Sequence, residues 1–128
     1  MKTMTAMRMF FVTAMLLVLS GCKAVQTVSY VDIQRYMGTW YQISAHETSF
    51  NKGLVGVTAN YTLLEDGSVQ VYNKGYLNSL DGELDEITGN AVVVDAVTNA
   101  RLKVKFPGVP NFPFANYLIV ILDENYEY

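Results

Sequence analysis

The side chains best suited to covalent chemistry in this sequence are few. Its 128 residues contain one cysteine, Cys22, and one histidine, His46. A lone cysteine has no partner for an internal disulfide, so it is an odd thiol, a nucleophile or an attachment point. A catalytic thiol needs a neighbouring base or positive field to form the thiolate, and only Lys23 lies beside Cys22. We therefore favour attachment over catalysis.

The remaining candidate ligands and acid–base groups do not form a familiar set. His46 has only Glu47 beside it, whereas a metal centre needs three or four suitable ligands. The four acidic residues between positions 81 and 86 offer carboxylate oxygens for calcium, but they lack the spacing of an EF-hand. We interpret them as a solvated loop. A single histidine also gives no secure Ser-His-Asp arrangement. The sequence therefore predicts no enzyme, no metal site and no cofactor.

The first 21 residues have the organisation of a secretory signal peptide. Lys2 and Arg8 provide a positive start, residues 9–19 carry no charge, and the small residues Ser20 and Gly21 precede the cysteine. Eleven apolar residues cover only about half of the ~30 Å hydrocarbon core, which disfavours a permanent membrane helix. The rest of the chain keeps seven basic and twelve acidic residues, a formal net charge of −5. Without a basic patch, we expect no nucleic-acid partner.

Residues 19–22, Leu-Ser-Gly-Cys, resemble the lipobox of bacterial lipoproteins. This resemblance implies cleavage before Cys22, lipidation of its thiol and acylation of the new amino group. Several buried acyl chains anchor a protein almost irreversibly, since each CH₂ contributes about 0.8 kcal/mol. The residue after the cysteine is Lys23 rather than Asp, so the resemblance implies the outer membrane, on its periplasmic face. Residues 22–31 then form the lipidated N-terminus and a tether.

The chain after residue 31 predicts an all-β domain, residues 32–128. Asp32 can cap one helical turn that Gly38 ends. Short β-rich runs follow, separated by turn residues such as Asp66-Gly67. Sequential runs joined mostly by short turns predict an up-and-down antiparallel meander. The expected runs are residues 40–45, 55–64, 69–75, 86–95, 101–106 and 114–122.

Residues 32–41, DIQRYMGTWY, resemble the first signature of the lipocalins, with Gly38 and Trp40 in its Gly-x-Trp motif. Residues 57–61, 66–69 and 71–76 resemble the bacterial branch of that family, and residues 102–106 and 117–123 fit its fifth and sixth strands. The resemblance implies an eight-stranded barrel whose last strands this chain lacks, because it stops at Tyr128 where the seventh strand is expected. Gly38 permits the bend into the first strand, and the resemblance gives Trp40 the structural role of plugging the closed end.

The same resemblance implies a carrier that binds, stores or transports fatty acids or lysophospholipids for envelope maintenance. Its lumen would be lined by alternate strand residues, although a bulge in any strand would exchange one set for the other. An alternative is an envelope interaction lipoprotein that has no lumen and binds partners through open sheet edges or the acidic loop. Open edges at the first and sixth strands also allow a homodimer that completes the sheet. The candidate lining residues are Val57, Ala59, Tyr61, Val71, Asn73, Val104, Phe106, Tyr117 and Ile119.

Overall fold

The fold is a single antiparallel meander that curls on itself. The computed structural model describes residues 23–128, so the expected signal peptide and Cys22 lie outside the described residues. Six strands pair in sequence order, each antiparallel to the next, which confirms the expected all-β meander. The elements are α2 (Ile33–Tyr36), β1 (Gly38–Tyr41), β2 (Leu54–Leu63), β3 (Val69–Leu77), β4 (Leu84–Val93), β5 (Arg101–Lys105) and β6 (Tyr117–Leu118).

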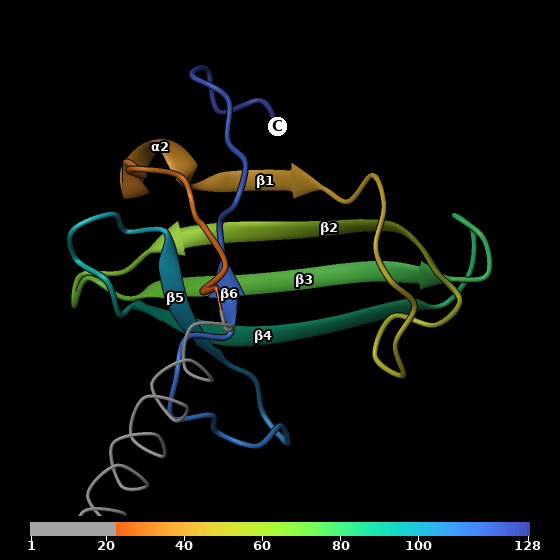
Figure 1. The fold of residues 1–128 in the computed structure, drawn as a ribbon. Helices are drawn as coiled ribbons and strands as arrows, with labels where there is room; N and C mark the ends of the chain where they lie inside the picture. Colours follow the sequence, from red (N-terminus) through yellow and green to blue (C-terminus); the bar gives the residue numbers. More distant parts are fainter. Residues whose placement is uncertain (1–22) are drawn as a thin grey trace, which may run out of the picture.

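The sheet has the shape of a half-barrel. Strands β1 to β4 run side by side, whereas β5 and β6 run steeply across them (Figure 1). Helix α2 lies beside the start of β1, at one end of the long strands (Figure 1). Among residues 23–128, no helix is long and apolar enough to cross a membrane.

Local side-chain hydrogen bonds explain where the helix and the tightest hairpin form. The Asp32 carboxylate accepts the backbone N–H groups of Gln34 and Arg35 at 3.0 and 3.2 Å, which caps α2. The hairpin between β2 and β3 turns at Gly67, where φ is +82°. Beside it, the Asp66 carboxylate accepts the N–H and the hydroxyl of Ser68, and these bonds lower the pKa of Asp66.

The first expected run is shorter in the structure than the sequence predicts. Strand β1 ends at Tyr41, and residues 42–53 form an exposed loop instead of continuing to residue 45. Its partner β2 has a register shift between Val55 and Thr58, where Gly56 adopts a φ of +59°. Because this bulge interrupts the pairing edge of β2, the β1 ladder stops where the bulge begins.

The sixth run is also shorter, because a side chain takes the place of the backbone. Strand β6 contains only Tyr117 and Leu118, rather than residues 114–122. The Asn116 amide accepts the Val104 N–H at 2.7 Å and donates to the Val104 carbonyl at 2.8 Å. These two bonds occupy the position of a backbone ladder pair. The residues before Asn116 therefore do not pair with this part of β5 as a strand.

Both chain segments outside the sheet pack against it. Val31 is 0% exposed, and its N–H donates to the Thr98 carbonyl, although the sequence placed this residue in the tether. The Val28 N–H donates to the Ile119 carbonyl. These contacts shorten the segment that is free to act as a tether. The buried core consists of Val31, Val69, Val71, Ala91, Ala100, Leu102 and Ile119.

The C-terminal segment lies against α2. The Arg35 guanidinium donates to the Glu124 carbonyl at 2.7 Å and lies 4.2 Å from the centre of the Tyr126 ring. The Tyr126 hydroxyl accepts the Asp32 N–H at 2.8 Å. This segment therefore packs against the helix. Among the described residues, it does not add a strand to the sheet.

Candidate functional site: two adjoining cavities inside the half-barrel

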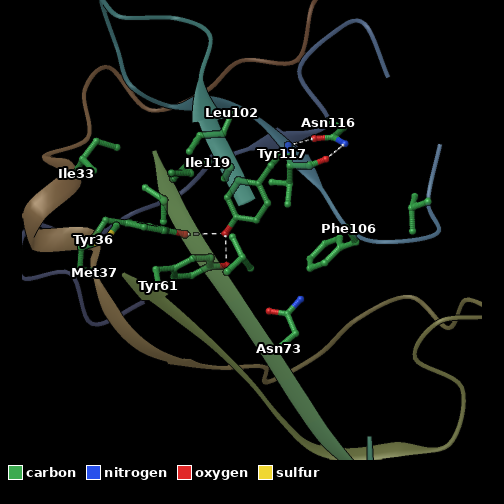
Figure 2. Close-up of a pocket in the computed structure, with 15 residues that line it drawn as sticks. Ile33, Tyr36, Met37, Tyr61, Asn73, Leu102, Phe106, Asn116, Tyr117 and Ile119 are labelled. Carbon is green, nitrogen blue, oxygen red and sulfur yellow. Dashed lines mark hydrogen bonds between the residues drawn. The ribbon is translucent and has the colours of Figure 1, made fainter. Parts of the chain in front are cut away.

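The concave face of the sheet encloses an inner cavity of about 190 Å³. Its walls come from α2, from strands β2 to β6 and from the segments that flank β5 and β6 (Figure 2). Every lining side chain is uncharged, and most are aliphatic or aromatic. A concave, mostly apolar cavity of this kind favours an apolar ligand, since burial of apolar surface drives binding.

The structure brings most of the predicted lining residues together. Seven of the nine line the inner cavity: Tyr61, Val71, Asn73, Val104, Phe106, Tyr117 and Ile119. Val57 lines a second cavity beyond it, and Ala59, opposite Trp40 and Asn73 in the register, lines neither cavity. The sequence left open which phase of each strand faces inward, and in the structure the phase that contains these seven residues lines the inner cavity.

The other lining residues were missed for two reasons. Val69, Ala91 and Leu102 belong to the inward phase of their strands, so a longer alternating set would have included them. Ile33, Tyr36 and Met37 come from the turn of α2, which folds over the end of the sheet. Nothing in a one-turn helix indicates which side faces a lumen. Val109 and Asn116 complete the lining from the β5–β6 connection.

Three tyrosine hydroxyl groups, one of them from α2, meet within the lining of the inner cavity. The Tyr117 hydroxyl lies 2.8 Å from that of Tyr36 and 3.1 Å from that of Tyr61 (Figure 2). Burial, reinforced by Tyr117, raises the pKa values of Tyr36 and Tyr61 far above the ordinary value of about 10. Tyr36 and Tyr61 therefore stay neutral. Two bonds among three hydroxyl groups use two of their three hydrogens, which leaves one donor for another partner.

Trp40 holds this cluster in place from outside the cavity. Its indole N–H donates to the Tyr36 carbonyl at 2.9 Å, and its ring stacks on the Tyr36 ring with a centroid distance of 4.8 Å. Gly38, between them, has a φ of +101°, which L side chains rarely adopt. Both residues therefore position Tyr36 and do not line either cavity.

Two asparagine side chains line the inner cavity, and they differ in their hydrogen bonding. Both ends of the Asn116 amide are bonded to the Val104 backbone, as described above. The Oδ1 atom of Asn73 is buried and has no hydrogen-bond donor among residues 23–128. A buried acceptor without a partner costs free energy, so Asn73 is the unsatisfied polar group of this cavity.

A wider outer cavity of about 590 Å³ adjoins the inner one, and Asn73, Phe106 and Val109 line both. Its other walls include polar residues of the loop 42–53 and three charged side chains, Lys74, Asp85 and Glu86. Glu86 accepts a hydrogen bond from the Tyr72 hydroxyl, and this bond raises the pKa of Tyr72. Both cavities have mostly apolar walls, but only the outer one, at the open end, carries charged side chains.

The residues considered for metal or acid–base chemistry lie apart from these cavities or are dispersed along them. His46 is exposed on the loop 42–53. Of the four acidic residues between 81 and 86, only Asp85 and Glu86 reach the outer cavity. Within residues 23–128, no three histidine, cysteine, aspartate or glutamate side chains are arranged to hold a metal ion. The site offers binding surfaces, with hydroxyl and amide groups as its inner polar contacts.

Comparison with known proteins gives one consistent answer. The family model of the lipocalin-like domain matches residues 31–128. The chain is 43% identical over 104 residues to the putative lipocalin R877 of Acanthamoeba polyphaga mimivirus, covering 78% of this chain and 59% of that protein. It is 38% identical over 128 residues to the outer membrane lipoprotein Blc of Vibrio cholerae, covering 95% of this chain and 72% of that protein.

The outer membrane lipoprotein Blc of Escherichia coli K12 is 40% identical over 107 residues, covering 83% of this chain and 58% of that protein. The chain thus spans less than two thirds of the length of two of these three relatives. The matched region contains the whole meander, α2 and both cavities. On the family model, the identity to these proteins and the half-barrel itself, the chain belongs to the lipocalin family and is similar to the Blc lipoproteins.

Proposed function

We propose that this protein is a lipid-anchored lipocalin of the outer membrane, which binds single-chain lipids such as fatty acids or lysophospholipids for storage or transport in envelope maintenance. The observation that carries the proposal is the pair of adjoining, mostly apolar cavities, without charge in the inner one and with charged side chains in the outer one at the open end. A single-chain lipid has the same two-part character. Its acyl chain would occupy the inner cavity and its head group the outer one.

The charge distribution supports this orientation of the ligand. The inner cavity has no charged side chain, so an ionised carboxylate or phosphate placed there would be desolvated without a counter-ion. The outer cavity has one ammonium group, Lys74, and the carboxylates of Asp85 and Glu86. A charged head group therefore has both solvent and charged partners only at the open end.

The volumes support a ligand that spans both cavities. The inner cavity, of about 190 Å³, is much smaller than the outer one, of about 590 Å³. In the proposed orientation, the acyl chain enters the inner cavity, and its first carbons and the head group lie in the outer one. Phe106 and Val109, which line both cavities, provide an apolar surface for the part of the chain that crosses between them.

Binding can be tested with two substitutions on adjacent residues of β5. Val104 faces the inner cavity, whereas Lys103 points to the opposite side of the strand. In the full chain, Val104→Trp should fill the cavity and weaken binding of a fluorescent fatty-acid probe at least tenfold. Lys103→Trp should change that affinity less than twofold. Equal affinities in both variants, with folding verified by circular dichroism, would show that the inner cavity does not bind the acyl chain.

The proposed location at the outer membrane rests on Cys22 and on the names of the relatives. Cys22 lies outside the described residues, but it ends a lipobox-like sequence, and two of the similar proteins are outer membrane lipoproteins. The Cys22→Ala variant should be released from membranes on fractionation, with lipid affinity unchanged, because residue 22 precedes the domain that forms the cavities. A Cys22→Ala protein that stays in the membrane fraction after leader removal would contradict the anchor.

A second candidate function, interaction through an open sheet edge, is favoured by one observation. Strand β1 is the first strand of the sheet and has a strand partner only on its β2 side within residues 23–128. Such an edge can pair with another chain, including a second copy of this one. Light scattering with and without a bound lysolipid separates the candidates. A monomer that binds lipid supports the carrier, whereas an oligomer without lipid affinity supports the interaction protein.

A further inference from the structure

The two asparagines that line the inner cavity differ clearly in their hydrogen bonding. Asn116 has its amide oxygen and nitrogen bonded to the Val104 backbone, so it is part of the sheet's own hydrogen bonding. Asn73 lines the same cavity with its Oδ1 buried and without a donor among residues 23–128. The two side chains have the same chemistry, but only the amide oxygen of Asn73 has no hydrogen-bond partner among residues 23–128.

The position of Asn73 places it where a bound lipid must pass. It is one of three residues that line both cavities, and it is the only polar one of these three. Along β3 it lies two residues beyond Val71, which is about 7 Å further toward the open end. Its register partners are Ala59 on β2 and Ile87 on β4, neither of which has a side-chain donor. Figure 2 shows the Asn73 amide directed into the space between Tyr61 and Phe106.

The ligand group that fits this position is a hydroxyl. A methylene group cannot donate a hydrogen bond, and an ionised carboxylate or phosphate can only accept one. Once the amide turns to present its buried oxygen to the cavity, a hydroxyl can donate to that oxygen, and it can also accept from the amide nitrogen. It carries no charge, so it can be buried beside Phe106 and Val109 once it is bonded.

We propose that Asn73 recognises a hydroxyl group on the bound lipid, at the point where the chain passes from the outer cavity to the inner one. This inference rests on the proposed lipid-binding function and adds a residue that selects among lipids. Two sources carry the same chemistry: an acyl chain with its own hydroxyl group, and the free glycerol hydroxyl of a lysophospholipid. Plain fatty acids lack such a group and leave the Asn73 oxygen unpartnered.

The test uses two pairs of lipids that differ only in the hydroxyl group. One pair is 2-hydroxypalmitate and palmitate. The other is 1-palmitoyl-lysophosphatidylcholine and the same lipid with its glycerol hydroxyl replaced by hydrogen. Each lipid displaces a fluorescent fatty-acid probe from the full chain. We expect the hydroxyl-bearing member of at least one pair to bind about tenfold more tightly to the wild-type protein, and the pair that shows the difference identifies the source.

The decisive variant is Asn73→Leu, which keeps the approximate size of the side chain and removes its polar atoms. The affinity ratio within the selective pair should fall to about one, mainly because the hydroxylated lipid binds less tightly. Gln70→Leu is the matched control, since it removes an exposed amide from β3 that lines neither cavity. Gln70→Leu should keep the wild-type ratio.

The outcomes separate this inference from the function on which it rests. If the wild-type protein binds all four lipids with affinities within twofold in each pair, Asn73 selects no hydroxyl group, although the carrier function stands. The same conclusion follows if Asn73→Leu retains the tenfold ratio. If the wild-type protein binds none of the four lipids and no probe, the proposed function itself is wrong. The thermal midpoint of Asn73→Leu without lipid should equal or exceed that of the wild type, because the variant removes an unpartnered buried oxygen.

Discussion

The two ends of the half-barrel are built on different principles. At the closed end, α2 covers the sheet, and the rings and hydroxyl groups of Tyr36, Tyr61 and Tyr117 form a bonded cluster. At the open end, the loops 42–53 and 78–83 meet, and they leave apolar side chains in solvent. Ile43 is 94% exposed and Phe50 is 76% exposed. Figure 1 shows these loops at the end of β2 and β3 opposite α2.

This contrast indicates what each end contributes. The closed end has the ring stacking and hydrogen bonds that fix the fold, so substitutions there should act mainly on stability. The open end has few such interactions, so substitutions there should leave stability nearly unchanged. The cavities connect the two ends, which places ligand entry where the chain is least constrained.

The largest expected difference between the ends comes from truncating one large side chain at each. Trp40→Ala removes both the ring stacked on Tyr36 and the bond to its carbonyl. We expect the free energy of unfolding to fall by about 3 kcal/mol. Ile43→Ala, at the open end, should change it by less than about 0.5 kcal/mol. Urea denaturation measures both, and equal losses would contradict the division between the ends.

The pH dependence of stability gives the next largest effect and is specific to the closed end. The pKa values of Tyr36 and Tyr61 are raised in the folded protein by burial and by Tyr117. The folded state therefore keeps protons that the unfolded chain releases above about pH 10, and stability falls as pH rises beyond that point. Each tyrosine should contribute a slope of at most about 1.4 kcal/mol per pH unit.

Phenylalanine variants isolate the contribution of these two hydroxyl groups to the pH dependence. Tyr36→Phe and Tyr61→Phe should each reduce the decline of the unfolding free energy between pH 10 and 11. Denaturant titrations at several pH values measure that slope. An unchanged slope in both variants would mean that these hydroxyl groups ionise as freely in the folded protein as in the unfolded chain.

A smaller effect is expected from the residue that joins the hydroxyl groups. Tyr117→Phe removes the shared partner of Tyr36 and Tyr61 but keeps the ring in the cavity wall. The loss of two hydrogen bonds should lower the free energy of unfolding by about 1–2 kcal/mol. An increase in the free energy of unfolding would instead show that burying the Tyr117 hydroxyl group costs more free energy than its hydrogen bonds contribute. Urea denaturation near neutral pH distinguishes the two.

Much of the fold could be predicted from the sequence because its signals are local. Asp32 and Gly38 define the ends of the single helical turn, and Asp66-Gly67 defines the tight hairpin. On β5, Leu102 and Val104 alternate with charged neighbours and both line the inner cavity, although the sequence left open whether this face points inward. Period-two patterns of this kind are visible whenever one face of a strand is buried.

The remaining features depend on contacts between distant residues, which local patterns do not contain. The start of β6 follows the Asn116 side chain, which is bonded to Val104, twelve residues away. The end of β1 coincides with the bulge at Gly56 in its partner strand. Val31 appeared to belong to a tether, but it is buried because its N–H bonds to Thr98 across the fold. The lumen-facing side of α2 was missed for the same reason.

The central claim is that the acyl chain lies in the inner cavity with its methyl end toward the tyrosine cluster. A palmitoyl lysophospholipid with a photoreactive diazirine at the end of its chain tests this claim most directly, when crosslinked to the full chain and mapped by mass spectrometry. We expect the label on Tyr36, Met37, Tyr61 or Tyr117, which lie at the closed end. A label confined to the loop residues 42–53, or to no single site, would contradict the proposed orientation and the role of the inner cavity.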